Sequence, residues 1–591
     1  MCYEELARFG YFEAGSGTMT KSVKTPWYKF YNGIKECLDY PDISIFQLIE
    51  ETSKKYPNYI ALNYFGKKFN YIKLMENINA CVKALKQNGI NKGDTVTICM
   101  PNTPEALFCF YALNKIGAIA SMIHPLSAEN EIKHYLEISN SKMLITIDLA
   151  LDKVANIIEQ TDVSKVITLS VKYSMPLHLK LGYQLTKESK IKKPILSNKF
   201  ISWQTFIKSG QRYTGETFEK QKGKDKAVIL YSGGTTAIPK GIVLSNLNFN
   251  ALAMQGIEAC ATLKPKYRLL AIMPIFHGFG LGICIHSSLY YGMTAIVLPQ
   301  FSSKEFHKLL IKYKPNVIAG VPTLYEALLK NENMSNIDLS FLKCAISGGD
   351  SLSVSLKKKI DVFLKKHNSD VEVREGYGLT ECVTGSCLMP VGNYRENSIG
   401  LPYPDTYYKI VEVGTQKELP YGEDGEIVLS GPTVMIEYLN NEKETNEALQ
   451  VHEDGLKWLH TGDLGYMDKD GFVYFKQRLK RIIKTSGYEI LPQYIENVLD
   501  SHPKVLMSTV IGIKHEYKKE VPKAFIVLKD NSEANDDVKK DIMKYCEKSL
   551  AKFSLPYEIE FRDSLPKTLV GKIDYKKLMD EGEEKENTAD E

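Results

Sequence analysis

Strand-like and helix-like segments alternate along most of this chain. The clearest run begins with a strand-like segment at residues 94–100 (DTVTICM) and a helix-like segment at 104–117. A second strand-like segment follows at 118–125, then a helix-like one at 129–139 and a third strand-like one at 142–148. This alternation is typical of βαβ units, in which helices cover both faces of a parallel sheet. We therefore expect an α/β fold, with a large N-terminal domain of mostly parallel sheets flanked by helices.

Length and charge narrow the class of protein. At 591 residues the chain is longer than a single hydrophobic core usually becomes, so at least two domains are expected. Hydrophobic residues make up 44% of the chain and charged residues 25%, as in ordinary globular proteins. The net charge of +4 is close to balance, which argues against nucleic-acid binding as the main function.

Cysteine spacing and apolar runs bear on the compartment. The eleven cysteines include no CxxC pair, so neither a zinc ribbon nor a disulfide framework is indicated. We recognise no secretory signal and expect a reducing, cytoplasmic location. The longest apolar stretches, which begin at residues 106 and 269, are interrupted by polar residues, Gly and Pro, so no transmembrane segment is expected, although a peripheral membrane contact stays compatible.

Three segments fall outside the alternating pattern. Residues 1–18 precede Met19 without periodicity, and we expect a disordered extension there. Residues 173–222 are rich in Lys, Ser and Gly, which indicates an insertion or mobile connection. Residues 579–591 form an acidic tail that we expect to be disordered.

One loop between two apolar runs has the composition of a phosphate site. Residues 229–246 read ILYSGGTTAIPKGIVLSN. The loop differs from the Walker pattern because Gly241, and not Ser or Thr, follows Lys240. Its backbone N–H groups and hydroxyls can still surround phosphate oxygens, with Lys240 as a point charge. The residues that would do so are Ser232, Gly233, Gly234, Thr235, Thr236 and Lys240.

Four further stretches are informative because of their order along the chain. They are SGGDSLS (347–353), REGYGLTE (374–381), HTGDLGYMDKDGFVYFKQRLKRIIKTSGYEI (460–490) and LPKTLVGKIDYKKL (565–578). Each alone is compatible with a plain turn, a packed tyrosine or a solvated surface lysine. Together with the loop they resemble the adenylate-forming superfamily of acyl-CoA synthetases, nonribosomal adenylation domains and luciferases. The resemblance runs from about residue 40 to 578.

The resemblance implies a two-step reaction. A carboxylate attacks the α-phosphorus of ATP, pyrophosphate leaves, and the acyl group of the acyl-AMP passes to the thiol of coenzyme A. Because negative charges crowd together in the first step, positioning and electrostatic stabilisation carry the catalysis. Tyr377 would stack on adenine, Thr380 would contact the α-phosphate, and Glu381 would hold Mg²⁺. Asp463 would accept hydrogen bonds from the ribose hydroxyls, with help from Arg478. The remaining nucleotide-site candidates are Gly348, Gly349, Asp350 and Gly378.

The resemblance also implies a moving C-terminal domain. Lys572 would bridge the substrate carboxylate and the α-phosphate, and it lies about a hundred residues beyond Asp463. We therefore expect an N-terminal domain at 19–479 and a C-terminal lid domain at 480–578, with the hinge at Lys480. After adenylation the lid would turn, and Ser486 and Gly487 would line the path of the thiol.

Three positions depart from the family pattern without removing a reacting group. Ala237 and Gln477 stand where glycine is usual, and Arg481 stands where an acidic residue is common.

The acid substrate is indicated less directly. Residues 274–282 (PIFHGFGLG) contain no carboxylate that could pair with an ammonium group, so an amino acid is not expected. His277 resembles the histidine that gates the acid pocket, and Gly278, Gly280 and Gly282 are expected to leave room for a chain or ring. The insertion PLHLKLGYQLTKESK (176–190) resembles that of fatty-acid-activating members, which favours a medium- or long-chain fatty acid over an aryl acid. Alternatives are an enzyme that loads a carrier protein and an inactive binding scaffold.

Overall fold

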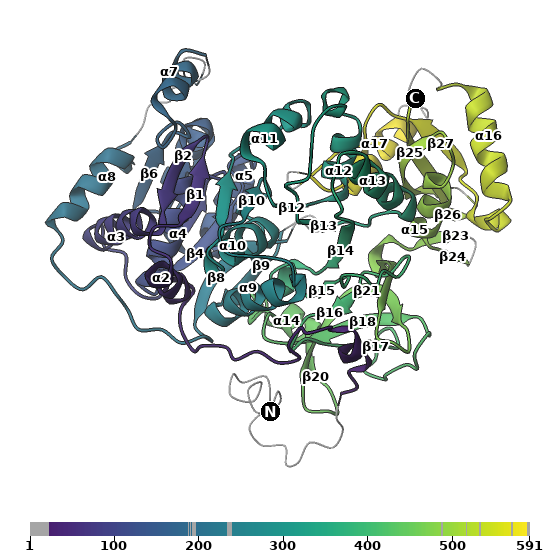
Figure 1. Ribbon diagram of the computed structural model, residues 1–591, viewed down its shortest axis with the longest axis horizontal. Helices are drawn as coiled ribbons and strands as arrows, with labels where there is room; N and C mark the ends of the chain where they lie inside the picture. The colour runs from purple at the N-terminus through teal and green to yellow at the C-terminus, as the bar shows by residue number, and fades with distance from the viewer. Residues whose placement is uncertain are drawn as a thin grey trace.

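The expected strands and helices form a mixed α/β molecule (Figure 1). The computed structural model describes residues 23–186, 188, 191, 197–232, 239–485, 488–515, 517–530, 534–568 and 571–587. A large N-terminal domain contains two mainly parallel sheets and one antiparallel sheet, and a small C-terminal domain contains a fourth sheet. The fold class predicted from the sequence is confirmed.

An eight-stranded sheet contains the segments with which the sequence argument began. Its order is β19-β9-β8-β4-β3-β5-β6-β7, and it is parallel from β8 to β7. The strands are β3 (Thr95–Cys99), β4 (Ile119–Ile123), β5 (Ser141–Ile147), β6 (Lys165–Leu169), β7 (Phe200–Ser202), β8 (Lys226–Tyr231), β9 (Gly241–Ser245) and β19 (Glu437–Tyr438). β3 is buried along its whole length because helices cover both faces of the sheet, which is why its residues are apolar or β-branched.

A nine-stranded sheet carries the next set of motifs. Its order is β16-β15-β14-β13-β12-β10-β11-β1-β2. The strands are β1 (Ile60–Tyr64), β2 (Lys67–Asn70), β10 (Arg268–Ala271), β11 (Thr294–Val297), β12 (Val317–Gly320), β13 (Cys344–Gly348), β14 (Val373–Tyr377), β15 (Cys387–Leu388) and β16 (Leu401–Pro402). Because β13 and β14 are parallel neighbours, their carboxyl ends at Gly348 and Tyr377 meet at one edge. That edge is where open α/β sheets bind ligands.

Helices cover both large sheets. They are α2 (Ile45–Lys55), α3 (Tyr71–Gln87), α4 (Pro104–Lys115), α5 (Glu129–Ile138), α6 (Leu151–Ile157), α7 (Leu177–Thr186), α8 (Trp203–Ser209), α9 (Asn246–Cys260), α10 (Ser287–Tyr290), α11 (Phe306–Tyr313), α12 (Pro322–Leu329) and α13 (Val354–Lys366). α4 shows how local sequence sets these bounds, because the Thr103 side chain accepts a hydrogen bond from the Ala106 N–H and proline stands first in the helix. The main core fills the space between the sheets and α2, α3, α4 and α9.

A five-stranded antiparallel sheet follows in the chain. It consists of β17 (Tyr407–Val411), β18 (Gly425–Ser430), β20 (Leu449–Val451), β21 (Lys457–Met467) and β22 (Val473–Arg478), with α14 (Glu442–Ala448) beside it. The sequence DKDG makes the turn between β21 and β22, where Gly471 has a φ of 88°. This hairpin sets Asp463 directly opposite Arg478.

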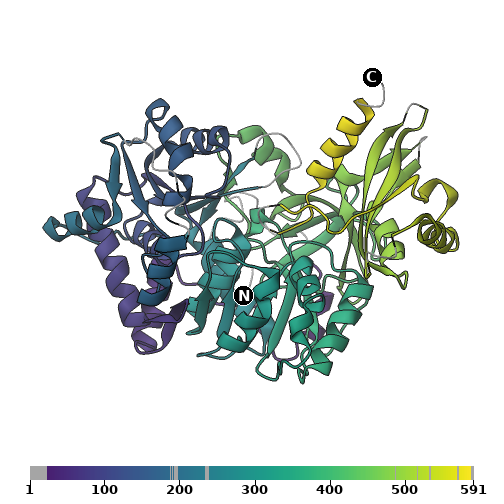
Figure 2. The ribbon, with the colours of Figure 1, turned by 90° about the horizontal axis from the view of Figure 1, so that it is seen from above.

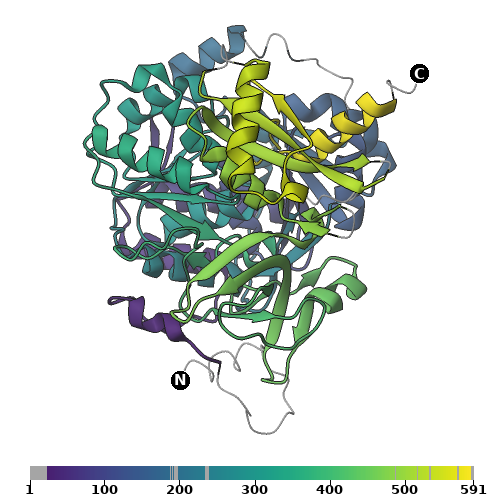
Figure 3. The ribbon, with the colours of Figure 1, turned by 90° about the vertical axis from the view of Figure 1, so that its right-hand side faces the viewer.

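The C-terminal domain lies at one end of the molecule (Figure 2). Its strands are β23 (Ile483–Thr485), β24 (Tyr488–Ile490), β25 (Val505–His515), β26 (Lys519–Leu528) and β27 (Glu558–Phe561), and its helices are α15 (Pro492–Asp500), α16 (Asp536–Glu547) and α17 (Tyr575–Asn587). Figure 3 shows this domain above the antiparallel sheet. The Lys359 ammonium of α13 donates to the Val505 carbonyl at 3.2 Å, so the two domains are in contact.

The segment 173–222 fits an insertion better than a mobile connection, because it contains α7 and α8, and β7 extends the eight-stranded sheet by pairing with β6. The structure also differs from the disorder expected for the acidic tail. The acidic tail is helical as far as Asn587, since α17 continues through it. Residues 1–18 lie outside the described part of the chain.

Candidate active site

A group of three side chains, joined by one hydrogen bond and one ion pair, forms where β14 meets the β21–β22 hairpin. The Tyr377 hydroxyl donates to Asp463 Oδ2 at 2.6 Å. The Arg478 Nε lies 3.5 Å from Asp463 Oδ1. The three residues predicted to bind adenine and ribose, from two different sheets, are thus brought together.

Asp463 keeps an acceptor open in this group. Its side chain is only 4% exposed, and Oδ1 has no hydrogen-bond partner among the described residues. Burial raises the pKa of Asp463, while the Arg478 charge and the Tyr377 hydroxyl act in the opposite direction. A buried carboxylate oxygen without a donor is costly, and a ribose hydroxyl would satisfy it. This observation fits the predicted nucleotide.

The turn after Tyr377 has little spare room. A Cβ on Gly378 would lie 2.4 Å from the Thr384 carbonyl oxygen, so only glycine fits there. Thr380 and Glu381 lie in a short 3₁₀ turn, Thr380–Cys382, and Val383 and Thr384 follow with φ of 53° and 76°. Two successive non-glycine residues in the left-handed region are uncommon, and such strain clusters at functional sites.

Glu381 and Lys240 are linked through Tyr438. The Tyr438 hydroxyl donates to Glu381 Oε1 at 2.9 Å. The Lys240 ammonium lies 4.8 Å from the centre of the Tyr438 ring and forms an ion pair with Glu444. The lysine of the phosphate loop and the predicted metal ligand therefore share one wall of the site. Glu444 pairs with Lys240 in this structure, so a phosphate that used Lys240 would have to displace Glu444.

The turn after β13 receives the loop that carries Lys572. Gly349 has a φ of +83°, and a Cβ there would lie 3.3 Å from Lys572 Cε. The Ile573 N–H donates to Asp350 Oδ2 at 3.3 Å. The Thr323 hydroxyl donates to the Gly571 carbonyl at 2.8 Å. These contacts cross between the domains and hold Lys572 beside the nucleotide candidates.

Charges of both signs surround Lys572. Burial and the Arg478 guanidinium lower the pKa of Lys572, and Asp350, Asp463 and Glu381 offset only part of this lowering. The ammonium thus lies in a region where anionic reactants would reduce the repulsion from Arg478. Such a position suits a cation that acts when a carboxylate and a phosphate meet.

His277 is buried and close to the same point. Burial, helped by the Lys572 charge, lowers the pKa of His277 to about 3, so the imidazole is neutral at pH 7. The Phe279 N–H donates to His277 Nδ1 at 3.3 Å. A π-helix, Phe279–His286, begins two residues after His277, and π-helices are often found at functional sites.

The glycines around His277 do not leave the room that was expected. A Cβ would lie 2.2 Å from Thr384 Oγ1 at Gly278, 2.1 Å from the Pro274 carbonyl oxygen at Gly280 and 2.6 Å from Leu252 Cδ2 at Gly282. The space beside each glycine is filled by the protein itself. These residues therefore allow close packing, and the expectation of open space was wrong.

The two arginines on either side of the predicted hinge interact with different residues. Arg478 pairs with Asp463, whereas Arg481 donates to Glu496 Oε1 on α15 at 2.8 Å and to the Val510 carbonyl at 3.3 Å. The Arg481 guanidinium also lies 3.8 Å from the centre of the Tyr575 ring. Lys480 is exposed between them in a 3₁₀ turn. The unusual basic residue at 481 thus has a structural role inside the C-terminal domain.

A magnesium ion would need ligands from its substrate. Within the described residues no group of three or more His, Cys, Asp or Glu side chains could hold a metal ion. Mg²⁺ usually takes one or two protein carboxylates and completes its shell with phosphate oxygens and waters. Glu381 fits that pattern as a single carboxylate ligand.

Some functional candidates were missed by sequence reasoning. Thr323, Tyr438 and Glu444 contact the loop of Lys572, Glu381 and Lys240 respectively. Thr384 is 7% exposed, and its Oγ1 has no partner among the described residues. None of these residues lies in a motif of distinctive composition. The one local signal is Gly385 directly after Thr384, which is compatible with a turn there. Gly233, Gly234, Thr235, Thr236, Ala237, Ser486 and Gly487 lie outside the described residues, and their roles remain predictions.

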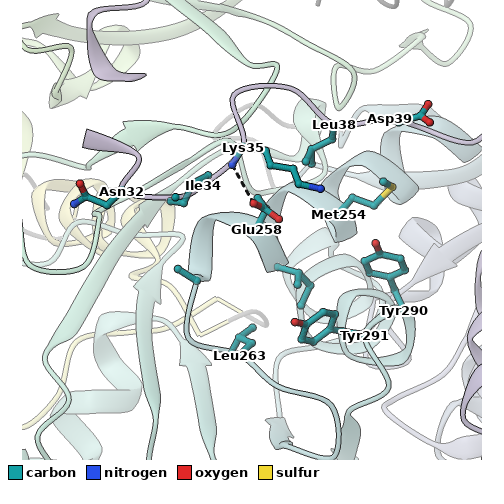
Figure 4. Close-up of a pocket in the computed structure, with 13 residues that line it drawn as sticks. Asn32, Ile34, Lys35, Leu38, Asp39, Met254, Glu258, Leu263, Tyr290 and Tyr291 are labelled. Carbon is teal, nitrogen blue, oxygen red and sulfur yellow. Dashed lines mark hydrogen bonds between the residues drawn. The ribbon is translucent and has the colours of Figure 1, made fainter. Parts of the chain in front are cut away.

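A separate pocket of about 470 Å³ lies between residues 32–39, α9 and the end of α10 (Figure 4). Its lining combines apolar side chains such as Met254 and Tyr290 with Lys35 and Glu258, and the Lys35 N–H donates to Glu258 Oε1 at 3.0 Å. None of the predicted site residues lines it. It is therefore distinct from the site around Lys572.

Comparison with known proteins defines the family. The family model of AMP-binding enzymes matches residues 49–439, and that of the AMP-binding enzyme C-terminal domain matches residues 494–572. The chain belongs to the family of AMP-binding enzymes.

The chain is similar to proteins named as CoA ligases. It is 33% identical to a long-chain-fatty-acid–CoA ligase of Bacillus subtilis (strain 168), over 94% of this chain and 98% of the relative. It is 30% identical to a probable 4-coumarate–CoA ligase of Dictyostelium discoideum, over 91% of this chain and 95% of the relative. Among solved structures, an anthranilate CoA ligase with bound anthranoyl-AMP has the same fold, with a TM-score of 0.81, 24% identity and coverage of 92% of this chain and 98% of that one.

Proposed function

We propose that this protein is an ATP-dependent acid–CoA ligase that activates a medium- or long-chain fatty acid. It would first form acyl-AMP and pyrophosphate, and then transfer the acyl group to the thiol of coenzyme A. The observation that carries the proposal is the position of Lys572, which the C-terminal domain places beside Gly349, next to the Tyr377–Asp463–Arg478 group.

The first step uses residues of both domains. Tyr377 and Asp463 orient the nucleoside, and the loop ending at Lys240 holds the β- and γ-phosphates. Lys572 stabilises the charge that develops as the carboxylate oxygen bonds to the α-phosphorus and the bond to pyrophosphate breaks. Mg²⁺, held by Glu381, would neutralise phosphate charge. The neutral His277 next to Lys572 lines the approach of the acid without adding a competing charge.

The second step requires a different arrangement. Lys572 occupies the position where the thiol has to reach the acyl carbon, so the C-terminal domain has to withdraw it. We assign the turn to Lys480, between an N-terminal domain at 19–479 and a lid at 480–578, and the path of the thiol to Ser486 and Gly487. The exposed position of Lys480 between two paired arginines supports this assignment.

The proposed class of acid rests on the charge of residues 274–282 and on the similarity to known CoA ligases. Residues 274–282 offer no carboxylate to an ammonium group, and a buried unpaired ammonium would be expensive. The similarity to a long-chain-fatty-acid–CoA ligase supports a fatty acid, and the similarity to 4-coumarate–CoA ligases keeps an aryl acid as the second choice. We place the enzyme in the cytoplasm.

A panel of acids tests the proposal. Purified protein is supplied with Mg-ATP and one acid at a time, from acetate through hexadecanoate to benzoate and 4-coumarate, and pyrophosphate release is measured with coenzyme A or with a holo-carrier protein. We expect the highest kcat/KM with a fatty acid of medium or long chain and coenzyme A. A preference for 4-coumarate, or for the carrier protein, would replace the proposal by the corresponding alternative. Absence of pyrophosphate release with every acid would indicate a binding scaffold.

A further inference from the structure

Helix α7 presents a row of leucines to solvent. Leu177, Leu181 and Leu185 are 73%, 53% and 79% exposed. Their spacing of four residues places them on neighbouring turns of one side of the helix. Figure 1 shows α7 at the periphery of the N-terminal domain, above β2 and β6. Three large aliphatic side chains in a row at such a place need an explanation, whereas single exposed leucines do not.

The other side of α7 attaches it to the domain. Tyr183 is half-buried and packs against the main core. The Lys180 ammonium lies 5.6 Å from the centre of the Tyr173 ring. Just before the helix, the Ser174 hydroxyl donates to the buried Glu105 carboxylate. The leucine row is therefore held outward by contacts on the inner side.

Positive charge is concentrated in the same part of the sequence. Residues 177–193 (LHLKLGYQLTKESKIKK) contain five lysines and one glutamate, so their formal net charge is +4. The whole chain of 591 residues has the same net charge, +4, so its remaining charges cancel. Of the five lysines only Lys180 lies in the described part of the chain, so the concentration of charge is a property of the sequence. An apolar helix face whose sequence neighbours are rich in lysine is the combination that binds the surface of a membrane with anionic lipids.

We propose that α7 is an interfacial helix that docks this enzyme on an anionic lipid bilayer through Leu177, Leu181 and Leu185. With ten residues it is too short to cross a bilayer, and no helix in the described parts of the chain is long and apolar enough to do so. The leucines are exposed on a helix at the rim of the domain, so their geometry suits insertion between lipid headgroups. The inference goes beyond the ligase reaction and does not depend on it.

Vesicle flotation tests the inference without any catalytic readout. Full-length protein is mixed with vesicles of phosphatidylcholine alone or of equal parts phosphatidylcholine and phosphatidylglycerol. We expect flotation with the anionic vesicles, weaker flotation with the neutral ones, and a decrease in high salt because screening removes the contribution of the lysines. The triple variant Leu177→Ser, Leu181→Ser, Leu185→Ser should lose about tenfold or more of its partitioning.

A matched control separates the helix from general surface hydrophobicity. The variant Leu126→Ser, Ile311→Ser, Val362→Ser changes three side chains on other elements that are 56%, 54% and 70% exposed. It should float as the wild type does. Both variants should keep the wild-type melting temperature and the wild-type kcat/KM for a short, water-soluble acid. Equal flotation of the two variants would overturn the proposal. It would also be overturned if the wild type bound no vesicles but formed a dimer that only the α7 variant disrupts.

Discussion

We predict that the replacement Lys572→Ala separates the two proposed chemical steps. The loop that carries this lysine is held by backbone groups, since the Gly571 carbonyl accepts from Thr323 and the Ile573 N–H donates to Asp350. Alanine at 572 leaves both contacts in place. The loss is therefore confined to the ammonium group and does not extend to the docking of the C-terminal domain.

The size of the effect follows from the charge that is removed. Two opposite unit charges about 4 Å apart attract each other by about 4 kcal/mol at an effective dielectric constant of 20. Removing one electrostatic donor from an active site typically costs about 2.7–4 kcal/mol, or a factor of about 100–1000 in kcat. We expect Lys572→Ala to form acyl-adenylate more slowly by about 100-fold or more. Binding of ATP through Tyr377 and Asp463 should change little.

Two separate assays measure the steps. Acyl-adenylate formation is followed by single-turnover pyrophosphate release without coenzyme A. Thioester formation is followed from synthetic acyl-adenylate and coenzyme A, which bypasses the first step. We expect the variant to be slow only in the first assay.

Lys567 provides a control on the same loop. It is exposed, and its bridge to Ile573 is made by backbone groups that alanine keeps, so Lys567→Ala should behave as the wild type in both assays. If Lys572→Ala were equally impaired in both assays, the lysine would act in the fold or in the thiol path. The two-arrangement mechanism would then have to be abandoned.

Three further predictions concern the metal, the hinge and pH. Glu381→Ala should reduce Mg-ATP-dependent acyl-adenylate formation by about 100-fold. Tyr438→Phe removes only a hydrogen bond to Glu381 and should have a smaller effect. Wild-type rates in Glu381→Ala would exclude Glu381 as a metal ligand. Lys480→Pro fixes φ at the hinge and should slow thioester formation more than adenylation in the same two assays, whereas equal losses would argue against a hinge there. Burial lowers the pKa of His286 to about 3, below the unfolded value of about 6.5. As pH falls, the unfolded chain therefore takes up the proton first. The free energy of unfolding should fall by up to about 1.4 kcal/mol per pH unit between about pH 6.5 and pH 3. His286→Gln should make the decrease in melting temperature over this range shallower, and an unchanged pH profile would contradict the assignment.

The parallel strands and the reacting residues could be predicted because each leaves a local signal. β3, β4 and β5 are short apolar runs, and they lie within or one residue beyond the segments expected. Tyr377, Asp463 and Arg478 stand in motifs whose residue types the chemistry requires, and the structure places them together.

The remaining features depend on contacts between distant parts of the chain. Tyr438 reaches Glu381 because β19 pairs with β9, almost two hundred residues earlier in the sequence, and nothing near Tyr438 indicates that pairing. Gly278 suggested open space, but whether a glycine leaves a gap or allows close packing depends on its neighbour, which is Thr384 here. β7 was overlooked because its three residues follow a polar segment and become a strand only by pairing with β6.

Arg478 and Arg481 would restrict the proposed movement of the lid, because each is held by a different domain. Arg478 pairs with Asp463 of the N-terminal domain, and Arg481 pairs with Glu496 of the C-terminal domain. Only Leu479 and Lys480 lie between these two ion pairs, so the proposed rotation would have to be absorbed by the backbone torsion angles of very few residues. A hinge this short would turn a local change in ψ into a rotation of the whole domain along a narrow arc. Lengthening the chain by one glycine after Lys480 should leave both domains folded but spoil the alignment of Lys572 with the bound nucleotide.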